Sequence, residues 1–148
     1  MLYLGIDPGK TGALAVIDSG GKFVGVVDFE ESFDYLVGSV EHHSAKSHFA
    51  YLEEVHSMPK QGVASTFAFG QNFGWWKGVL QALRIPFKTV RPQDWQKGLV
   101  PKKNGLTDKP GLDVARQLYP EAPLNLKKHH NRADAILLAR VCLQREGK

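Results

Sequence analysis

The chain has 148 residues, 43% apolar and 23% charged, which is the profile of one soluble globular domain spanning residues 1–148. The formal net charge of +4 suits an anionic partner such as nucleic acid. No apolar run approaches membrane-spanning length, and a predicted strand that begins at residue 2 leaves no room for a signal peptide. The single cysteine, Cys142, excludes an intramolecular disulfide, so we expect a reducing, cytoplasmic environment.

The first part of the chain alternates short apolar segments with turn residues. These segments predict strands over residues 2–7, 13–17 and 23–29, and tight glycine-containing turns between them indicate an antiparallel meander. An amphipathic helix is expected over 32–44. A fourth strand is expected over 48–55, and it carries two adjacent glutamates near its end.

A long helix is predicted over residues 64–84. Large apolar residues recur along it at steps of three and four, and glycines recur every four residues: Gly70, Gly74 and Gly78. Such a glycine row favours close approach of the domain's own sheet, a partner helix or a nucleic-acid backbone. Phe67 and Trp75 lie outside the apolar stripe and are candidates for stacking on unpaired bases, with core or dimer packing as the alternative.

Basic residues gather in the second half of the chain. A fifth strand is expected over 87–90, and a polar, lysine-rich loop follows over 101–109. Its lysines, with one more in the first turn, are candidates for contacts with nucleic-acid phosphates, a plain solvated loop being the alternative: Lys10, Lys102, Lys103 and Lys109. A helix with Pro110 in its first turn and an apolar helix that begins near residue 129 complete the predicted order.

Three carboxylates occupy places that are unusual for a charged group. Asp7 closes the first strand, Glu53 ends the fourth, and Asp134 lies within the apolar C-terminal helix. Asp7 by itself is equally well explained as a turn residue that bonds its own backbone. If the first and fourth strands are neighbours and the last helix packs on them, the three carboxylates meet, and such a cluster suits Mg²⁺ or Mn²⁺. Two such ions about 4 Å apart can activate a water and stabilise the leaving oxygen of a phosphodiester.

Three motifs together resemble the RuvC family of Holliday junction resolvases, within the RNase H-like superfamily. Residues 5–12 (GIDPGKTG) are similar to the opening motif of that family, 52–55 (LEEV) to its second acidic motif, and 132–139 (RADAILLA) to its last. The resemblance implies an α/β, RNase H-like fold with a five-stranded mixed sheet flanked by helices. Residues 92–95 and the lysine-rich loop resemble the compact resolvases of phages and organelles more than the bacterial housekeeping type.

The family usually has a fourth metal-site residue one helical turn before the last aspartate, either acidic or histidine. This chain has His130 four residues before Asp134 and Asn131 three residues before it. His130 is favoured, because a neutral imidazole binds metal or acts as a base, whereas an amide is a poorer ligand; Asn131 remains the alternative. The resemblance thus implies a catalytic and metal-binding set of Asp7, Glu53, His130 and Asp134, with two Mg²⁺ or Mn²⁺ ions per active site.

The resemblance also implies an activity and partners. It implies a homodimer that binds four-way junction DNA and nicks two opposing strands symmetrically, as a metal-dependent endonuclease of DNA recombination. The long glycine-bearing helix is then a candidate for the dimer face or for holding open the centre of the junction. Two alternatives stay open: another RNase H-like nuclease that acts on RNA or simple duplexes, and a non-catalytic junction-binding protein.

Overall fold

The computed structural model describes residues 1–30, 32–41, 48–54, 56, 59–102 and 108–147. Its elements follow the predicted order, with two short additions, α3 and η1, that the sequence did not predict. In chain order they are β1 (Leu2–Asp7), β2 (Ala13–Asp18), β3 (Phe23–Asp28), α1 (Phe33–Glu41), β4 (His48–Glu53), α2 (Val63–Ala82), β5 (Phe87–Val90), α3 (Pro92–Gln96), α4 (Pro110–Leu118), η1 (Lys127–His129) and α5 (His130–Glu146).

The strands form one mixed sheet in the order β3-β2-β1-β4-β5. β1, β2 and β3 form the predicted antiparallel meander, whereas β4 runs parallel to β1 and β5 runs parallel to β4. The parallel register places Leu52 of β4 beside Ile6 of β1, so both strands end at the same edge of the sheet. The five-stranded mixed sheet that we expected is confirmed.

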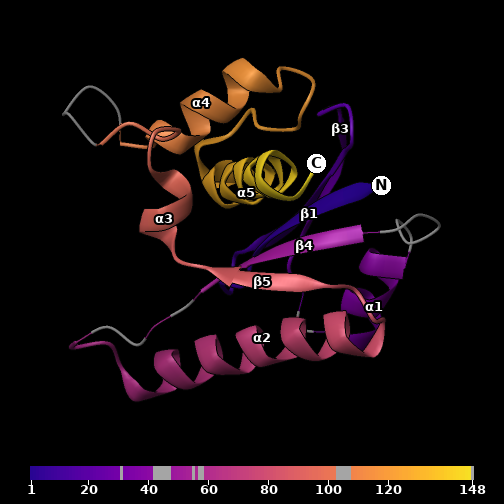
Figure 1. Ribbon diagram of the computed structural model, residues 1–148. Helices are drawn as coiled ribbons and strands as arrows, with labels where there is room; N and C mark the ends of the chain where they lie inside the picture. The colour runs from indigo at the N-terminus through magenta and orange to yellow at the C-terminus, as the bar shows by residue number, and fades with distance from the viewer. Residues whose placement is uncertain (31, 42–47, 55, 57–58, 103–107, 148) are drawn as a thin grey trace.

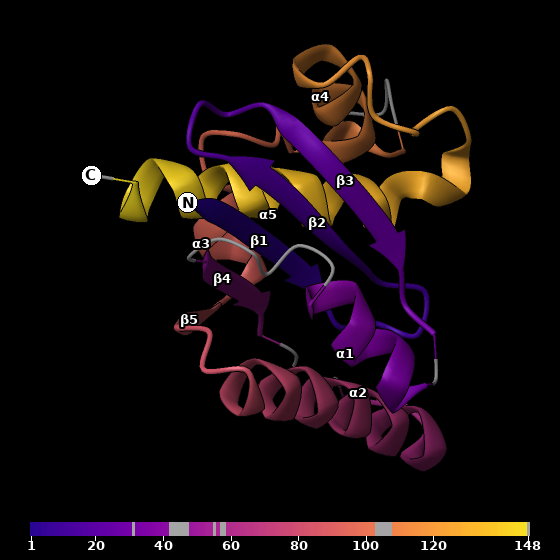
Figure 2. The ribbon, with the colours of Figure 1, turned by 90° about the vertical axis from the view of Figure 1, so that its right-hand side faces the viewer.

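Helices cover both faces of this sheet (Figures 1 and 2). α1 and α2 lie on one face, and α5 with α4 lies on the other. Strand alternation divides the core between them: Leu4 and Ile6 of β1 join the cluster of Trp76 and Leu80 from α2, whereas Tyr3 joins the cluster around α5. The odd-numbered residues of β1 therefore face α5. Within the described part of the chain, no helix is both long and apolar enough to cross a membrane.

The backbone of α5 lies directly against β1 at Gly5. A Cβ atom at this position would overlap the carbonyl oxygen of Ala135 and the amide nitrogen of Ala139, so only glycine fits there. Alanines on the buried side of α5 allow the same close approach from the helix. The helix that carries Asp134 is thus held close to the strand that ends in Asp7.

The glycine row of α2 lies at the surface. No described atom outside the helix's own backbone lies within 4 Å of a Cβ atom built on Gly70, Gly74 or Gly78. The expectation that these glycines pack closely on the domain's own sheet is therefore wrong. The physical reason is that α2 turns a different face to the sheet, on which Trp76 and Leu80 are fully buried.

Candidate active site

Asp7 is the last residue of β1 and lies on the face of the sheet that α5 covers. Its Oδ1 accepts a 2.9 Å hydrogen bond from the backbone N–H of Gly9. The turn interaction that an aspartate forms at such a place is therefore present. Burial nevertheless raises the pKa of this carboxyl group, although the bond from Gly9 opposes the rise. Asp7 thus combines a turn role with the desolvation that is typical of functional carboxylates.

Glu53 ends β4, the parallel neighbour of β1, and strand alternation places it on the same face as Asp7. Its Oε2 accepts a 2.7 Å hydrogen bond from Nε1 of Trp95, a side chain of α3 that is 1% exposed. Burial and the nearby charge of Asp7 raise the pKa of Glu53 to about 7, and the Trp95 bond opposes the rise. In the next residue, Glu54, the Oε1 atom lies instead 3.4 Å from Nε2 of His56. Only the first of the two glutamates therefore faces the aspartate of β1.

Asp134 lies in the second turn of α5, against the N-terminal end of α4. The contact depends on Gly111, because a Cβ atom there would lie 3.0 Å from Oδ1 of Asp134. Burial, followed by the charges of Asp7 and Glu53, raises the pKa of Asp134 to about 8, and the charge of Lys109 offsets part of this rise. The charges of both strand-end carboxylates act on Asp134, so α5 brings this residue to the same region of the sheet edge as Asp7 and Glu53.

The three carboxylates interact electrostatically, and their oxygens are the kind of donor that a hard divalent cation prefers. Within the described residues, no three Asp, Glu, His or Cys side chains gather closely enough to hold one ion together. Mg²⁺ does not need such a cage, because one or two carboxylates, waters and substrate phosphates usually hold it. The donor set consists of hard oxygen ligands, and burial together with their mutual repulsion raises the pKa of two of them. Mg²⁺ and Mn²⁺ prefer such ligands and would relieve the repulsion.

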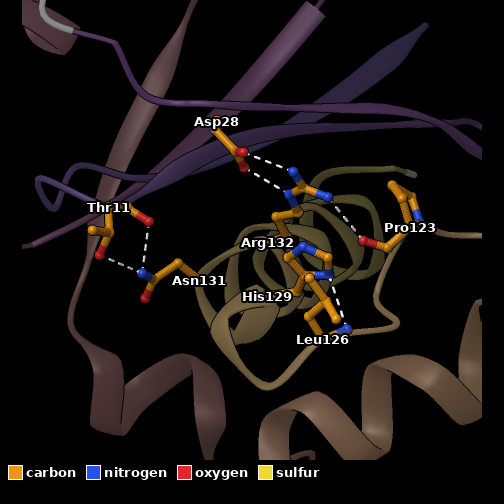
Figure 3. Close-up of polar contacts among 7 residues, drawn as sticks. All are labelled: Thr11, Asp28, Pro123, Leu126, His129, Asn131 and Arg132. Carbon is orange, nitrogen blue, oxygen red and sulfur yellow. Dashed lines mark hydrogen bonds and ion pairs between the residues drawn. The ribbon is translucent and has the colours of Figure 1, made fainter.

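The two candidates for the fourth position make different contacts. His130 lines the cavity that Asp134 also lines, and burial together with the charge of Lys109 lowers the pKa of its imidazole. The lowered pKa favours the neutral form of the imidazole. Asn131 directs its amide nitrogen at Thr11 and donates 2.6 Å hydrogen bonds to the carbonyl oxygen and Oγ1 of that residue (Figure 3). These contacts give Asn131 a structural role, whereas His130 lines the same cavity as Asp134.

Polar contacts fasten the start of α5 to the sheet (Figure 3). The Arg132 guanidinium donates two 2.7 Å hydrogen bonds to the Asp28 carboxylate at the end of β3, and a third of 3.1 Å to the carbonyl oxygen of Pro123. The pairing lowers the pKa of Asp28. Nδ1 of His129 accepts a 3.2 Å hydrogen bond from the backbone N–H of Leu126. Together these contacts fix the helical turn that precedes the buried aspartate of α5.

The C-terminal end of α5 is fastened as well. Glu146 accepts 2.6 Å hydrogen bonds from the Tyr51 hydroxyl group and from the Lys88 ammonium group. Arg145 donates a 2.9 Å hydrogen bond to the carbonyl oxygen of Asp94. Because both ends of α5 are bonded to other elements, the helix cannot slide along the sheet without breaking several charge-assisted hydrogen bonds.

The lysines predicted to contact phosphates come from two separate segments of the chain. Lys10 is exposed in the turn after β1, close in sequence to Asp7. Lys102 and Lys109 are exposed and line the cavity beside the α5 carboxylate. Lys103 lies outside the described residues. A DNA backbone that reaches the carboxylates would therefore meet positive charge from two different segments.

The two predicted aromatic contacts differ in exposure. Phe67 near the start of α2 is 73% exposed. Trp75 is half-buried, and its ring centroid lies 6.4 Å from that of Phe29 in a tilted arrangement. Trp75 thus packs against the core between α2 and the sheet, whereas the Phe67 ring lies open to solvent.

Three residues that shape the site were missed at the level of sequence: Trp95, Gly111 and Arg132. The indole nitrogen of a buried tryptophan needs an acceptor, and this was a signal that Trp95 approaches a polar group. Gly111 follows Pro110 in the first turn of a helix, where a glycine suggests close approach. Arg132 had no usable signal, because its partner Asp28 lies more than a hundred residues away in the chain.

Comparison with known proteins finds structural relatives. No protein-family model and no curated protein sequence matches the chain. A structure of Thermus thermophilus RuvC matches with a TM-score of 0.66 and 20% identity, covering 99% of this chain and 97% of that chain. A structure of T. thermophilus RuvC in complex with a Holliday junction substrate matches with a TM-score of 0.67 and 17% identity, covering 95% and 91%. The chain has a RuvC-like fold.

The RuvC-like fold confirms the architecture that the sequence motifs indicate. The match extends over nearly the whole length of both chains, so the RNase H-like arrangement of sheet and helices is common to them. At 17% to 20% identity the likeness concerns the fold alone. The chemistry of this chain therefore has to be argued from its own carboxylates and their surroundings.

Proposed function

We propose that this RuvC-like protein is a divalent-metal-dependent endonuclease that resolves four-way DNA junctions by symmetric nicking. The observation that carries the proposal is that three half-buried carboxylates from β1, β4 and α5 interact electrostatically: Asp7, Glu53 and Asp134. Burying several like charges together destabilises a fold, so their presence at one place indicates that they have a chemical task. A metal-assisted hydrolysis of phosphodiesters gives them that task.

The residues of the site divide the chemistry between them. Asp7, Glu53 and Asp134 would hold two Mg²⁺ or Mn²⁺ ions, which supply positive charge for the phosphate oxygens and lower the pKa of a bound water. His130 completes this set as a neutral imidazole beside Asp134, where it can ligate or accept a proton. Trp95 keeps the Glu53 carboxylate in place through its indole hydrogen bond.

A four-way junction is favoured as substrate over RNA or a simple duplex. One structure that shares this fold was determined with a Holliday junction substrate, which supports DNA recombination and repair as the setting. A two-fold junction calls for a homodimer with two active sites related by the same symmetry. Val63 and Phe67 at the start of α2 are 87% and 73% exposed and offer apolar surface for the second copy or for the junction centre.

Cleavage of synthetic substrates tests the activity. Four-way junction, flap, duplex and RNA–DNA hybrid are incubated with the protein in Mg²⁺ or Mn²⁺, and the nicks are mapped on each strand. Paired symmetric nicks in the junction alone are the expected result. Efficient cleavage of the hybrid would assign the protein to the RNA-directed alternative. Junction binding without nicking in either metal would favour the non-catalytic alternative.

Adjacent glutamates provide a matched test of the site. Glu53→Gln is expected to abolish nicking, because it removes one of the coupled carboxylates, whereas Glu54→Gln should leave nicking nearly unchanged. Asp7→Asn is likewise expected to abolish nicking but to spare junction affinity, because the phosphate-contacting lysines remain. Equal nicking by the Glu53→Gln and Glu54→Gln variants would contradict the assignment of the site.

A further inference from the structure

A cavity of about 560 Å³ lies beside the proposed active site. It is an open cavity lined by α3, residues 97–102, residues 108–109, the start of α4 and the first turns of α5. His130 and Asp134 form part of its wall, so the cavity opens onto the carboxylates. The proposed reaction uses these two side chains and the phosphate contacts of Lys102 and Lys109, and it assigns no role to the other side chains of the cavity.

The cavity wall combines three kinds of chemistry. Gln93 and Gln96 of α3 supply amide donors and acceptors. Val100 and Leu112 supply apolar surface. Three lysines add positive charge, which outweighs the one carboxylate besides Asp134, that of Asp108: Lys97, Lys102 and Lys109. A nucleotide presents the matching set, which is an apolar base face, a hydrogen-bonding base edge and a negative phosphate.

We infer that this cavity takes one unpaired nucleotide of the bound DNA strand, adjacent to the phosphate that is cleaved. The inference rests on the proposed nuclease function. The volume lies within the roughly 300–1,000 Å³ of small-ligand sites. That is far too little for a duplex, so the base must leave the helical stack to enter. Because the cavity and the carboxylates share Asp134, a phosphate at the carboxylates places the neighbouring base at the cavity mouth.

The side chains also indicate which base is preferred. No Phe, Tyr or Trp is among the described residues that line the cavity, so hydrogen bonds at the base edge give more of the recognition than stacking does. Glutamine amides pair most favourably with the N6 and N7 edge of adenine. The cavity therefore selects a purine, and adenine above all, next to the nick.

The test uses 2-aminopurine, a base whose fluorescence rises when it leaves the stack. Junctions carry one 2-aminopurine at each position that flanks the nick mapped with the wild-type protein, and the Asp7→Asn protein binds them without cutting. A several-fold rise is expected at one flanking position. Gln96→Phe, which fills the cavity mouth, should abolish the rise, whereas Gln117→Phe on an exposed position of α4 outside the cavity should not.

A second variant removes the amide without adding bulk. Gln96→Ala in an otherwise wild-type protein should reduce the preference for adenine over the other bases beside the nick by about tenfold. Free deoxyadenosine monophosphate, added in excess, distinguishes a nucleotide of the strand from a free one: it should leave the fluorescence rise unchanged.

The inference would be overturned by a bound junction that shows no rise in 2-aminopurine fluorescence at any flanking position, or by a fluorescence rise that persists in the Gln96→Phe variant. An adenine preference that persists in the Gln96→Ala variant would overturn it as well. A rise displaced by the free monophosphate while the junction stays bound would assign the cavity to a free nucleotide instead. If the wild-type protein nicks no junction at all, the proposed function fails first and the inference falls with it.

Discussion

Replacing Asp134 with asparagine is predicted to stabilise the protein while it abolishes nicking. The carboxyl group is buried beside Asp7 and Glu53, and its pKa is raised to about 8. Between about pH 4 and pH 8 the folded protein therefore holds a proton that the unfolded chain has released. The free energy of unfolding falls as the pH rises through this window, because the folded state binds more protons. Asparagine has nearly the same shape and carries no charge, so the variant escapes this loss.

The size of the effect follows from the pKa of Asp134. The rise from 3.8 to about 8 covers about four pKa units. At about 1.4 kcal/mol per unit, an isolated group would lose about 5 to 6 kcal/mol above pH 8. The repulsion is shared with two neighbours and partly screened by water, so we expect a gain of about 1 to 3 kcal/mol for Asp134→Asn at pH 9. At pH 5 most of the gain should disappear, because the carboxyl group is then protonated in the folded protein.

Urea unfolding at pH 5, 7 and 9 without divalent ions measures this gain. Glu121→Gln, at an exposed position after α4, is the control and should show no pH-dependent gain. Added Mg²⁺ or Mn²⁺ at pH 9 should raise the unfolding free energy of the wild type more than that of Asp134→Asn, because binding to the folded state stabilises it. A gain of equal size at pH 5 and pH 9, or no gain at pH 9, would refute the reasoning.

Three further predictions concern residues that support the carboxylates. Gly111→Ala places a Cβ atom 3.0 Å from Oδ1 of Asp134, so nicking should fall by about tenfold, while urea unfolding shows a stability change of at most about 1 kcal/mol. Trp95→Phe removes the donor to Glu53, so the acidic midpoint of the pH–rate profile should move to higher pH with junction affinity unchanged; an unmoved midpoint would contradict this role. Arg132→Leu removes the pair that fastens the start of α5 and should lower the unfolding free energy by about 1 kcal/mol or more, whereas an unchanged value would show that the contact is dispensable.

Local patterns were sufficient to predict the elements that carry the carboxylates. The alternation of apolar residues in β1 and the glycines of the following turn define a hairpin whose first strand ends in Asp7. A strand that ends at Glu53 and an apolar helix around Asp134 follow from the same short-range rules. Parallel pairing of β1 with β4 then needs only the intervening helix α1, which provides the crossover connection.

Contacts between distant segments were not predictable in this way. The bond from Trp95 to Glu53 spans 42 residues, and α3 is a helix of five residues with too short a repeat to show periodicity. Helix α2 carries a stripe of large apolar residues and a stripe of glycines, and either could pack on the sheet. The apolar stripe packs there because Trp76 buries a large apolar side chain, and the glycines therefore face solvent. The packing of the whole core determines which face of the helix is buried, and the spacing of residues within one segment cannot predict it.

The position of α5 explains how the fold tolerates the repulsion at its centre. Three carboxylates that push one another apart would move the helix away from β1, yet Gly5 lets the two backbones touch. The Arg132–Asp28 pair fastens one end of the helix, and the bonds of Glu146 fasten the other. Each of these contacts lies outside the carboxylate cluster, so the stabilising contacts and the strained site are separate. A variant that removes one of these anchoring contacts should therefore lower the free energy of unfolding without changing the metal preference of the proposed site. A variant of a carboxylate in the cluster should change the metal preference without lowering the free energy of unfolding.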